Sequence, residues 1–234
     1  MITGYSGSPA RFFRGALHNR QLRPFLVKHG SISLPDSLQY NYSLEKPRSN
    51  FGSNYQTVYS YGYELPPSSF SKIVQPLLTD NLFEISQILG SDFLVNNIRF
   101  WRNLSMPKSQ HSVDHYSNVF HQDTVRDQNL IQIFVLLTDV GLEDGPFEWY
   151  EKDLHAKAHQ FFKRRSNTIY LQDEKISLPN SNQLTGSRGS YLLLNTGYHY
   201  HRDGIPKQGR ERVIMSIGLF PSYTKIGIPS ESLL

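Results

Sequence analysis

After Gly90 the chain alternates between short apolar runs and turn residues, with no sustained helical period. Seven segments are rich in β-branched, aromatic or aliphatic residues and are bounded by Gly, Pro, Asn, Asp or Ser: FLVNNIRFW, SNVFHQD, LIQIFVLLTDV, GPFEWY, TIYLQ, GSYLLLNTGYHYH and ERVIMSIGLF. One helix is expected among them, over 152–165. Because strands and helices do not alternate, the pattern disfavours an α/β sheet. It predicts a mainly β protein, a double-sheet jelly roll or a barrel, with flanking helices.

The first 90 residues show a different pattern, in which loops and helices predominate. A short helix is expected near 17–27, and the aromatic, β-branched run Tyr55–Leu65 predicts a strand. Residues 68–90 predict two helices, with Pro76 bending or breaking the first. The second is expected to use Asp80 as N-cap and Gly90 as its stop, and to bury Phe83, Ile85 and Ile88. We therefore expect one domain over 1–234, with an N-terminal helical and loop layer (1–90) on a jelly-roll core (91–222).

Composition narrows the class of protein without naming a function. The chain has 234 residues and no cysteine, which excludes a disulfide framework, a thiolate metal site and a cysteine nucleophile. No apolar run approaches the roughly 18 residues of a membrane span, and the N-terminus lacks the apolar core of a secretory signal, so a cytoplasmic location is expected. The net charge is +4, and residues 1–50 hold seven Lys or Arg against Asp36 and Glu45. Such an arm is most often a solvated face, but it suits an anionic partner.

Candidate metal chemistry begins at NVFHQDTVRDQ, where His121 and Asp123 are two positions apart. On a strand, both side chains project from one face. Two histidines and one carboxylate form the facial triad that holds non-haem Fe(II) and leaves positions open. The missing histidine is sought in NTGYHYHRDG, where His199 and His201 have the same parity. Strand alternation alone cannot separate these two.

An arginine is the second requirement of this chemistry. In GRERVIMSIGLF, Arg210 and Arg212 are expected to share a face of one strand. The planar guanidinium binds a carboxylate in bidentate fashion, which suits the distal carboxylate of 2-oxoglutarate. The 2-oxo acid at the other end of that molecule would chelate the iron.

Taken in order, the H-x-D motif, LLTDV…EDGPFEW, a distal histidine and an arginine eleven residues later resemble the phytanoyl-CoA dioxygenase family over about residues 95–221. Members are Fe(II)- and 2-oxoglutarate-dependent oxygenases on a double-stranded β-helix, a jelly roll of the cupin-like kind. The resemblance implies that His121, Asp123 and His201 bind iron and that Arg212 binds 2-oxoglutarate. Thr196 is also expected to be a cofactor-binding residue, because it matches the position where several members have Asp-Thr ahead of the distal histidine, although Asn195 replaces the acid here.

The resemblance also implies a reaction. With Fe(II), 2-oxoglutarate and O2, such an enzyme oxidises an unactivated C–H bond of a small molecule and releases succinate and CO2. Related halogenases have a small residue at the second ligand position, so Asp123 favours hydroxylation, desaturation or another oxidation over halogenation. The chain departs from the family in reading WYEKDLHAKAHQ where a Pro-Gly-Ser-His motif is common, and residues 1–90 match nothing in the family.

Other polar residues are weaker candidates. Asn103 is expected to help hold 2-oxoglutarate. Gln132 interrupts an otherwise apolar strand, so a side chain that points toward the site is expected there as well. The alternative for both residues, and for Arg99 and Arg102, is an ordinary surface position. HSVDH resembles a helical zinc pair but lacks its glutamate and lies in a loop, so a lid or surface position is expected. LHAKAH is expected to be a solvated helix face. The histidines of these two motifs are His111, His115, His155 and His159.

Two alternative functions stay open at this point. A nucleic-acid repair dioxygenase of the same fold usually carries a second arginine just beyond the first, but VIMSIGLF after Arg212 contains none. A jelly-roll binding protein without catalysis would not need the complete H-x-D, histidine and arginine set. A small-molecule partner is therefore favoured over nucleic acid or a membrane, with a weak preference for an anionic one. The sequence does not predict an oligomeric state.

Overall fold

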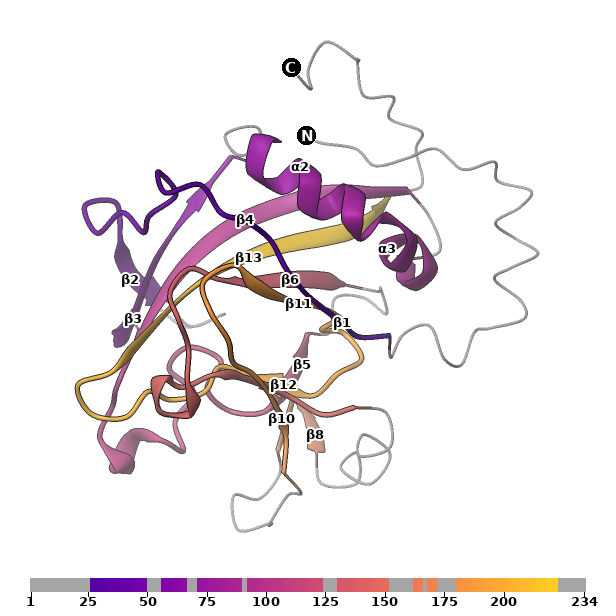
Figure 1. The fold of residues 1–234 in the computed structure, drawn as a ribbon. Helices are drawn as coiled ribbons and strands as arrows, with labels where there is room; N and C mark the ends of the chain where they lie inside the picture. The colour runs from indigo at the N-terminus through magenta and orange to yellow at the C-terminus, as the bar shows by residue number, and fades with distance from the viewer. Residues whose placement is uncertain are drawn as a thin grey trace.

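Two antiparallel β-sheets face each other in the computed structural model, and helices cover the outside of the larger sheet (Figure 1). The structure describes residues 26–49, 56–66, 71–89, 92–123, 130–151, 162–165, 168–171 and 180–222. Within these residues the larger sheet has seven strands, in the spatial order β1 (Lys28–Ser31), β11 (Ser190–Asn195), β6 (Ile131–Leu136), β13 (Glu211–Ser222), β4 (Asp92–Leu104), β3 (Gln56–Leu65) and β2 (Lys46–Ser49). The smaller sheet has six, in the order β10 (Asn182–Leu184), β7 (Phe147–Trp149), β12 (His201–Arg202), β5 (His121–Asp123), β9 (Thr168–Leu171) and β8 (Phe162–Arg165).

The order in which the chain visits the two sheets identifies the topology. From β4 onward the chain passes from the larger sheet to β5 in the smaller sheet, back to β6, and across again to β7 and β10. It then returns to β11, crosses to β12 and ends on β13 in the larger sheet. Strands β8 and β9 follow β7 and precede β10 in the sequence. They pair with each other, and β9 pairs with β5, so they extend the smaller sheet beyond β5. This is the double-stranded β-helix, or jelly roll, and the predicted fold class is confirmed.

The central strands of the larger sheet are buried on both faces. Helices α2 (Ser71–Asp80) and α3 (Leu82–Leu89) cover its outer face, where Ile133 and Val135 of β6 join their apolar cluster. Phe134 and Leu136 alternate with these residues and pack toward the smaller sheet. Double coverage explains why β6 and β11 read as nearly continuous apolar runs. A polar side chain on the inner face of these strands therefore needs a hydrogen-bond partner there.

The N-terminal segment contributes strands as well as helices. The expected strand over Tyr55–Leu65 is confirmed as β3, which pairs with β4. Strands β1 and β2, which sequence did not predict, pair with β11 and β3 respectively. The expected helix near 17–27 lies outside the described residues apart from its last two positions, which are not helical. The N-terminal layer is therefore partly an extension of the larger sheet.

Two predictions about helix α3 need correction. Phe83 is 71% exposed, because the buried face of α3 carries Ile85, Ile88 and Leu89, a spacing that leaves position 83 off the stripe. Asp80, the expected N-cap of α3, is instead the last residue of α2. Asn81 lies between the two helices: its carbonyl accepts from the Ile85 N–H, and its side chain donates to the Leu77 carbonyl.

Helix α2 runs through Pro76 and is not broken there. Of the helix expected over 152–165, residues 152–161 lie outside the described part of the chain, and residues 162–165 form strand β8. The expected helix stop, Gly90, also lies outside the described residues.

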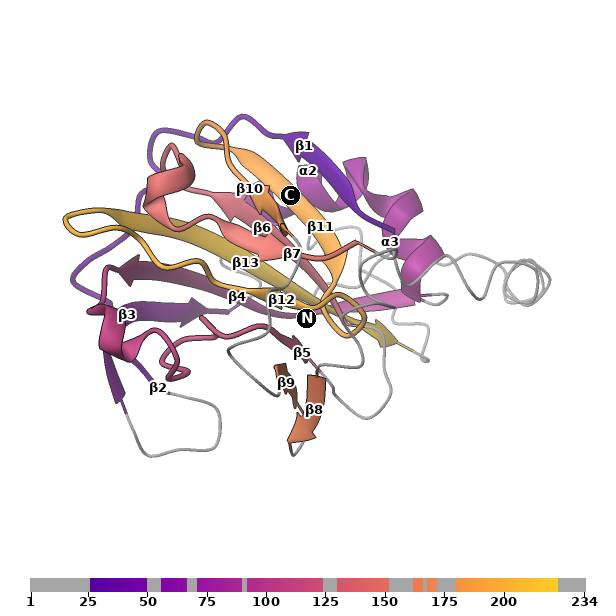
Figure 2. The same ribbon diagram turned by 90° about the horizontal axis from the view of Figure 1, so that it is seen from below.

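Single 3-10 turns occur at Lys108–Gln110 and Leu142–Asp144. Figure 2 views the molecule from the side of the smaller sheet, with β5, β7 and β12 in front of the strands of the larger sheet. No helix in the described part of the chain is long and apolar enough to cross a membrane.

Candidate metal centre

His121, Asp123 and His201 come together on two neighbouring strands of the smaller sheet. His121 on β5 and His201 on β12 are direct register partners, and their ring centroids lie 4.4 Å apart. The Asp123 carboxylate lies 3.6 Å from Nε2 of His121 and 3.7 Å from Nε2 of His201. One ligand atom from each residue lies within 4.8 Å of the other two, and this is the one such group of three potential ligands in the part of the chain described. A single cation can contact all three.

Backbone carbonyls fix the orientation of both imidazoles. Nδ1 of His121 lies 2.8 Å from the Val119 carbonyl oxygen, and Nδ1 of His201 lies 2.9 Å from the His199 carbonyl oxygen. A carbonyl oxygen only accepts, so each Nδ1 carries the proton and donates. The lone pair of each neutral ring is therefore on Nε2, the atom that faces Asp123. Hydrogen bonds of this kind orient metal-binding histidines in proteins.

The electrostatics of the group favour one carboxylate beside at least one neutral histidine. Burial, together with the neighbouring His121, lowers the pKa of His201 to about 4. Burial also opposes a charge on His121, but the Asp123 carboxylate outweighs it and raises the His121 pKa above its ordinary value. The same histidines and Thr196 hold the pKa of Asp123 well below its usual range, despite the opposing effect of its burial. Asp123 is thus a carboxylate at neutral pH.

Two residues hold Asp123 in place. Gln132 is the polar residue on the inner face of β6, and its Nε2 donates to Asp123 Oδ2 at 3.0 Å. The backbone N–H of Asp123 donates to the Thr196 carbonyl at 3.0 Å. Thr196 Oγ1 in turn donates to the Leu130 carbonyl at 3.2 Å. These contacts connect Thr196 to Asp123; the predicted contact of Thr196 with a cofactor stays a prediction.

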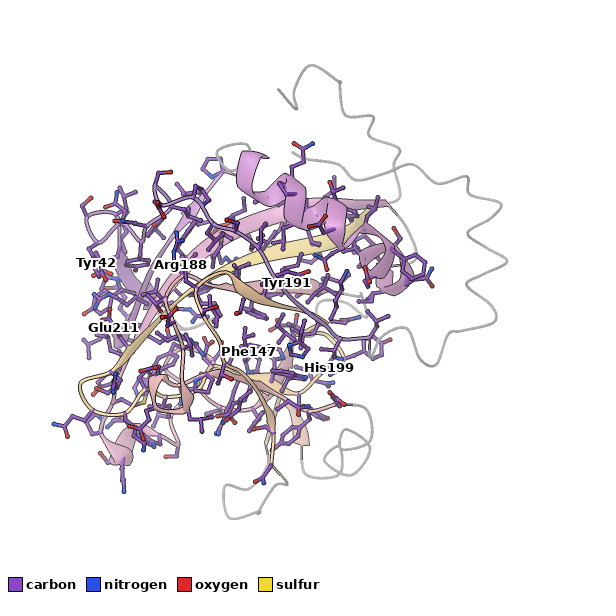
Figure 3. The ribbon with its side chains drawn as sticks, in the orientation of Figure 1. Tyr42, Phe147, Arg188, Tyr191, His199 and Glu211 are labelled. Atoms are coloured by element: carbon purple, nitrogen blue, oxygen red, sulfur yellow. The ribbon has the colours of Figure 1, made fainter. Side chains whose placement is uncertain are left out.

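The structure distinguishes His199 from His201 and Arg210 from Arg212, which strand alternation alone could not do. His199 precedes β12 and its Nδ1 lies 2.8 Å from the Tyr150 carbonyl oxygen; it is not part of the group of three ligands. In Figure 3, His199 and Phe147 lie in the lower layer of the molecule, among the strands of the smaller sheet. Arg210 lies before β13 with its side chain 60% exposed, whereas the Arg212 side chain is fully buried. The prediction that the two arginines share a strand face is therefore wrong, because β13 begins at Glu211 and does not include Arg210.

Arg212 is fixed by its two terminal nitrogens. Nη1 donates to the Gly145 carbonyl at 2.6 Å and Nη2 donates to Asp203 Oδ1 at 2.5 Å. Gly145 adopts φ +68°, and a Cβ there would lie 2.4 Å from the backbone nitrogen of Pro206, so only glycine fits this turn. The Asp-Gly-Pro-Phe turn thereby supplies an oxygen to Arg212.

Asn103 lies beside Arg212 as its register partner across β4 and β13. Its Oδ1 accepts from Ser60 Oγ at 2.6 Å. Two buried donors here, Asn103 Nδ2 and Arg212 Nε, have no hydrogen-bond partner among the described residues. Leaving a buried donor without an acceptor is costly, so a ligand oxygen that reaches these two donors would be stabilised here.

Sequence reasoning missed two residues of this region, Arg48 and Asp203. Arg48 on β2 donates to Asp203 Oδ2 at 3.1 Å, so Asp203 lies between Arg48 and Arg212. Burial opposes ionisation of Asp203, but Arg212 and Arg48 outweigh it and hold its pKa below the usual range. These two residues are 155 positions apart, and no local pattern in the sequence marks either of them.

The remaining candidates lie elsewhere. A lid or surface position is expected from the sequence for both histidines of HSVDH. His111 is exposed, whereas His115 is buried with its Nε2 3.0 Å from Gln110 Oε1, so a surface position is wrong for His115. Neither belongs to the group of three ligands. His155 and His159 fall outside the described residues. Arg102 pairs with Glu45 and Glu211, and Arg99 lies 3.5 Å from Glu64, so both are engaged with carboxylates.

Comparisons with solved structures find alignments at low sequence identity. No protein-family model and no curated protein matches the chain by sequence. HygX from Streptomyces hygroscopicus, in a crystal structure with nickel and 2-oxoglutarate bound, is 14% identical with a TM-score of 0.43; the match covers 71% of this chain and 71% of HygX.

The non-haem α-ketoglutarate-dependent epimerase SnoN from nogalamycin biosynthesis is 12% identical with a TM-score of 0.49, over 92% of this chain and 84% of SnoN. A prolyl-4-hydroxylase from Pseudomonas putida is 14% identical with a TM-score of 0.49, over 89% and 99%. Similarities of this strength do not identify a reaction, so the side chains of the site have to carry any functional assignment.

Proposed function

We propose that this protein is an Fe(II)- and 2-oxoglutarate-dependent oxygenase that oxidises a C–H bond of a small molecule. The observation that carries the proposal is the convergence of His121, Asp123 and His201, whose ligand atoms lie within 4.8 Å of one another. Two neutral imidazole nitrogens and one carboxylate on one side of a metal are the donor set of non-haem Fe(II) oxygenases. When bound, the iron supplies the oxidising chemistry with 2-oxoglutarate and O2.

The chain's own residues prepare the iron ligands. The carbonyls of Val119 and His199 keep the Nδ1 protons in place, so that both Nε2 atoms are available to a metal. Gln132 orients the Asp123 carboxylate. Phe147 stacks against His201, with ring centroids 5.6 Å apart, and belongs to the apolar cluster between the sheets. This apolar contact limits access of water to that side of the histidine.

The two unpartnered donors support 2-oxoglutarate as the cosubstrate. Asn103 Nδ2 and Arg212 Nε belong to register partners on the inner face of the larger sheet and lack an acceptor among the described residues. A carboxylate is an acceptor with two oxygens and can satisfy both donors. We assign Arg212 the ionic contact with the distal carboxylate and Asn103 a hydrogen bond to it. This assignment keeps the role that the resemblance to the phytanoyl-CoA dioxygenase family implied for Arg212 and the role that the sequence suggested for Asn103, while Thr196 is assigned to the support of Asp123.

The outcome of the reaction follows from the ligand set in one respect. Asp123 occupies the position that must hold a small residue to admit a halide, so we propose hydroxylation, desaturation or another oxidation. The primary substrate is proposed to be a small molecule.

Succinate formation tests the proposal. Purified protein with Fe(II), ascorbate and 2-oxoglutarate should form succinate slowly in air, and faster when a metabolite library contains the primary substrate. Mass spectrometry of the accelerated reactions should then detect a product oxidised relative to its substrate. His121→Ala should form no succinate above the level of free iron, and the exposed His111→Ala variant should match the wild type. Equal succinate formation by wild type and His121→Ala would refute the proposal and favour a jelly-roll binding protein.

A further inference from the structure

Asp203 is a buried carboxylate placed between two arginines. Arg212 Nη2 lies 2.5 Å from its Oδ1 and Arg48 Nη1 lies 3.1 Å from its Oδ2. Exposure of the three side chains is 0% for Arg212, 12% for Asp203 and 19% for Arg48. The arrangement connects the larger sheet's central strand β13 to its edge strand β2 through one carboxylate.

Arg48 is held firmly by three kinds of contact. In addition to Asp203, its Nη1 donates to the Tyr116 carbonyl at 3.1 Å. Its guanidinium lies over the Trp101 ring, 3.2 Å from the ring centroid, in the geometry of a cation–π contact. Trp101 in turn donates from Nε1 to Ser216 Oγ on β13 at 3.0 Å. A side chain fixed in this way holds its charge at a defined place beside Asp203.

The orientation of Arg212 follows from its partners. Gly145 and Asp203 use its two terminal nitrogens, while Nε has no acceptor among the described residues. The guanidinium therefore presents its Nε side to an incoming carboxylate, and its register partner Asn103 offers a second unpartnered donor, Nδ2, from the neighbouring strand. Loss of Asp203 would leave Arg212 with one fixed contact, at Gly145, in place of two.

The charge balance explains why a second arginine is needed. Asp203 and Arg212 alone form a neutral pair, and an anion binding there would meet the negative charge of Asp203 nearby. With Arg48 the three groups carry a net charge of +1, which one further carboxylate brings to zero. Interactions between charges are strong in a partly buried setting, so the net charge of +1 should bind an anionic ligand more tightly than a net charge of zero.

We propose that Arg48 and Asp203 are positioning residues for the carboxylate that Arg212 binds. Asp203 orients the Arg212 guanidinium, and Arg48 neutralises Asp203 so that it does not repel the ligand. The inference rests on the proposed function in taking that ligand to be 2-oxoglutarate. It gives one residue of the basic N-terminal segment a defined role at the site.

The test is the affinity for 2-oxoglutarate, measured by anaerobic calorimetry on Fe(II)-loaded protein. Arg48→Gln should raise the Kd roughly tenfold, since two like charges less than a nanometre apart at an effective dielectric constant near 20 repel by more than 1.4 kcal/mol. Arg48→Lys retains the charge but not the planar stack on Trp101, and it should bind 2-oxoglutarate more tightly than Arg48→Gln does. The decisive variant is the double substitution Arg48→Gln with Asp203→Asn. It removes the uncompensated charge, and its Kd should return to within about threefold of the Asp203→Asn variant.

Arg102→Gln is the matched control. Arg102 is an arginine of the same sheet that pairs with Glu45 and Glu211. Glu211 and its partner Tyr42 lie at one edge of the molecule in Figure 3, away from Phe147 and His199. The 2-oxoglutarate affinity of this control should equal that of wild type. Each variant is also checked for folding and for iron stoichiometry, and the iron stoichiometry should equal that of wild type.

The possible failures are distinguishable. If wild type does not bind 2-oxoglutarate, or if Arg212→Gln binds it as wild type does, the proposed function is wrong. If Arg212→Gln loses binding while Arg48→Gln keeps it, only the positioning role is wrong. If the effect of Arg48→Gln persists in the Asp203→Asn background, or if Arg48→Lys binds as weakly as Arg48→Gln, then charge compensation of Asp203 is refuted.

Discussion

Gln132→Leu should weaken metal binding although Gln132 is not itself a ligand. Its Nε2 donates to Asp123 Oδ2 at 3.0 Å, and its neighbours on the inner face of the two sheets are apolar. Leucine has nearly the same volume and fits an apolar strand, so the substitution removes the hydrogen bond with little change in packing. The Asp123 carboxylate then loses the contact that orients it toward His121 and His201.

The magnitude follows from the type of hydrogen bond. A bond to a charged acceptor contributes about 1.5–3 kcal/mol. If most of this free energy stabilises the metal-bound state, its loss raises the Kd for Fe(II) about 10- to 100-fold, the range typical of residues that orient metal ligands. The melting temperature should stay close to that of wild type, because leucine replaces a lone polar residue in an apolar strand.

Anaerobic calorimetric titration with Fe(II) measures this effect, with thermal unfolding followed in parallel. Gln183→Leu is the control, since Gln183 is an exposed glutamine on β10 and should leave the Kd unchanged. A folded Gln132→Leu protein that binds Fe(II) within twofold of wild type would refute the role of this hydrogen bond.

The same geometry makes three further predictions. His201→Asn keeps a donor at the position of Nδ1 but removes Nε2, so it should lose Fe(II) binding in equilibrium dialysis, whereas His199→Asn should keep one equivalent; the reverse result would exchange the two residues. Because Asp123 raises the pKa of His121 and a metal must displace that proton, the apparent affinity should fall about tenfold per pH unit below this pKa and level off above it. Calorimetry in buffers of different ionisation enthalpy should detect the released proton, and a pH-independent affinity would contradict the assignment of His121. Ile133→Ala, at a fully buried position of β6, should lower the free energy of unfolding by about 2–5 kcal/mol in denaturant titrations and should keep the metal stoichiometry of wild type. Loss of metal binding without loss of stability would show that the outer face of the sheet is not independent of the site.

Much of the jelly roll could be predicted because its strands are buried on one or both faces. Strands β6, β11 and β13 carry apolar runs that burial requires, and turn residues bound them. Strands β1 and β2, with the sequences KHGS and KPRS, lack such a pattern because they pair along the edges of the larger sheet through their backbones. Edge strands with charged residues and proline do not read as strands from sequence.

The candidate site was predictable as far as its chemistry depends on residue type and spacing. The H-x-D motif places two groups on one face of β5, as alternation requires. Alternation did not separate His199 from His201, because β12 begins only at His201 and the preceding turn returns to the Asn195 carbonyl. Arg210 and Arg212 were paired for a similar reason, since β13 begins between them.

The Arg48–Asp203 contact could not be predicted at all. It depends on the edge strand β2 and the segment after β12 meeting in three dimensions. Neither residue lies in a motif with recognisable spacing.

The most direct test of the central claim is a spectroscopic titration under anaerobic conditions. Fe(II) is added to the metal-free protein, followed by 2-oxoglutarate, and the visible charge-transfer absorption of a 2-oxo acid chelated to Fe(II) is recorded. Wild type should develop a saturable band at one equivalent of iron, and Asp123→Ala should develop none. A wild-type protein that binds no stoichiometric iron, or that binds it and shows no band with saturating 2-oxoglutarate, would contradict the account.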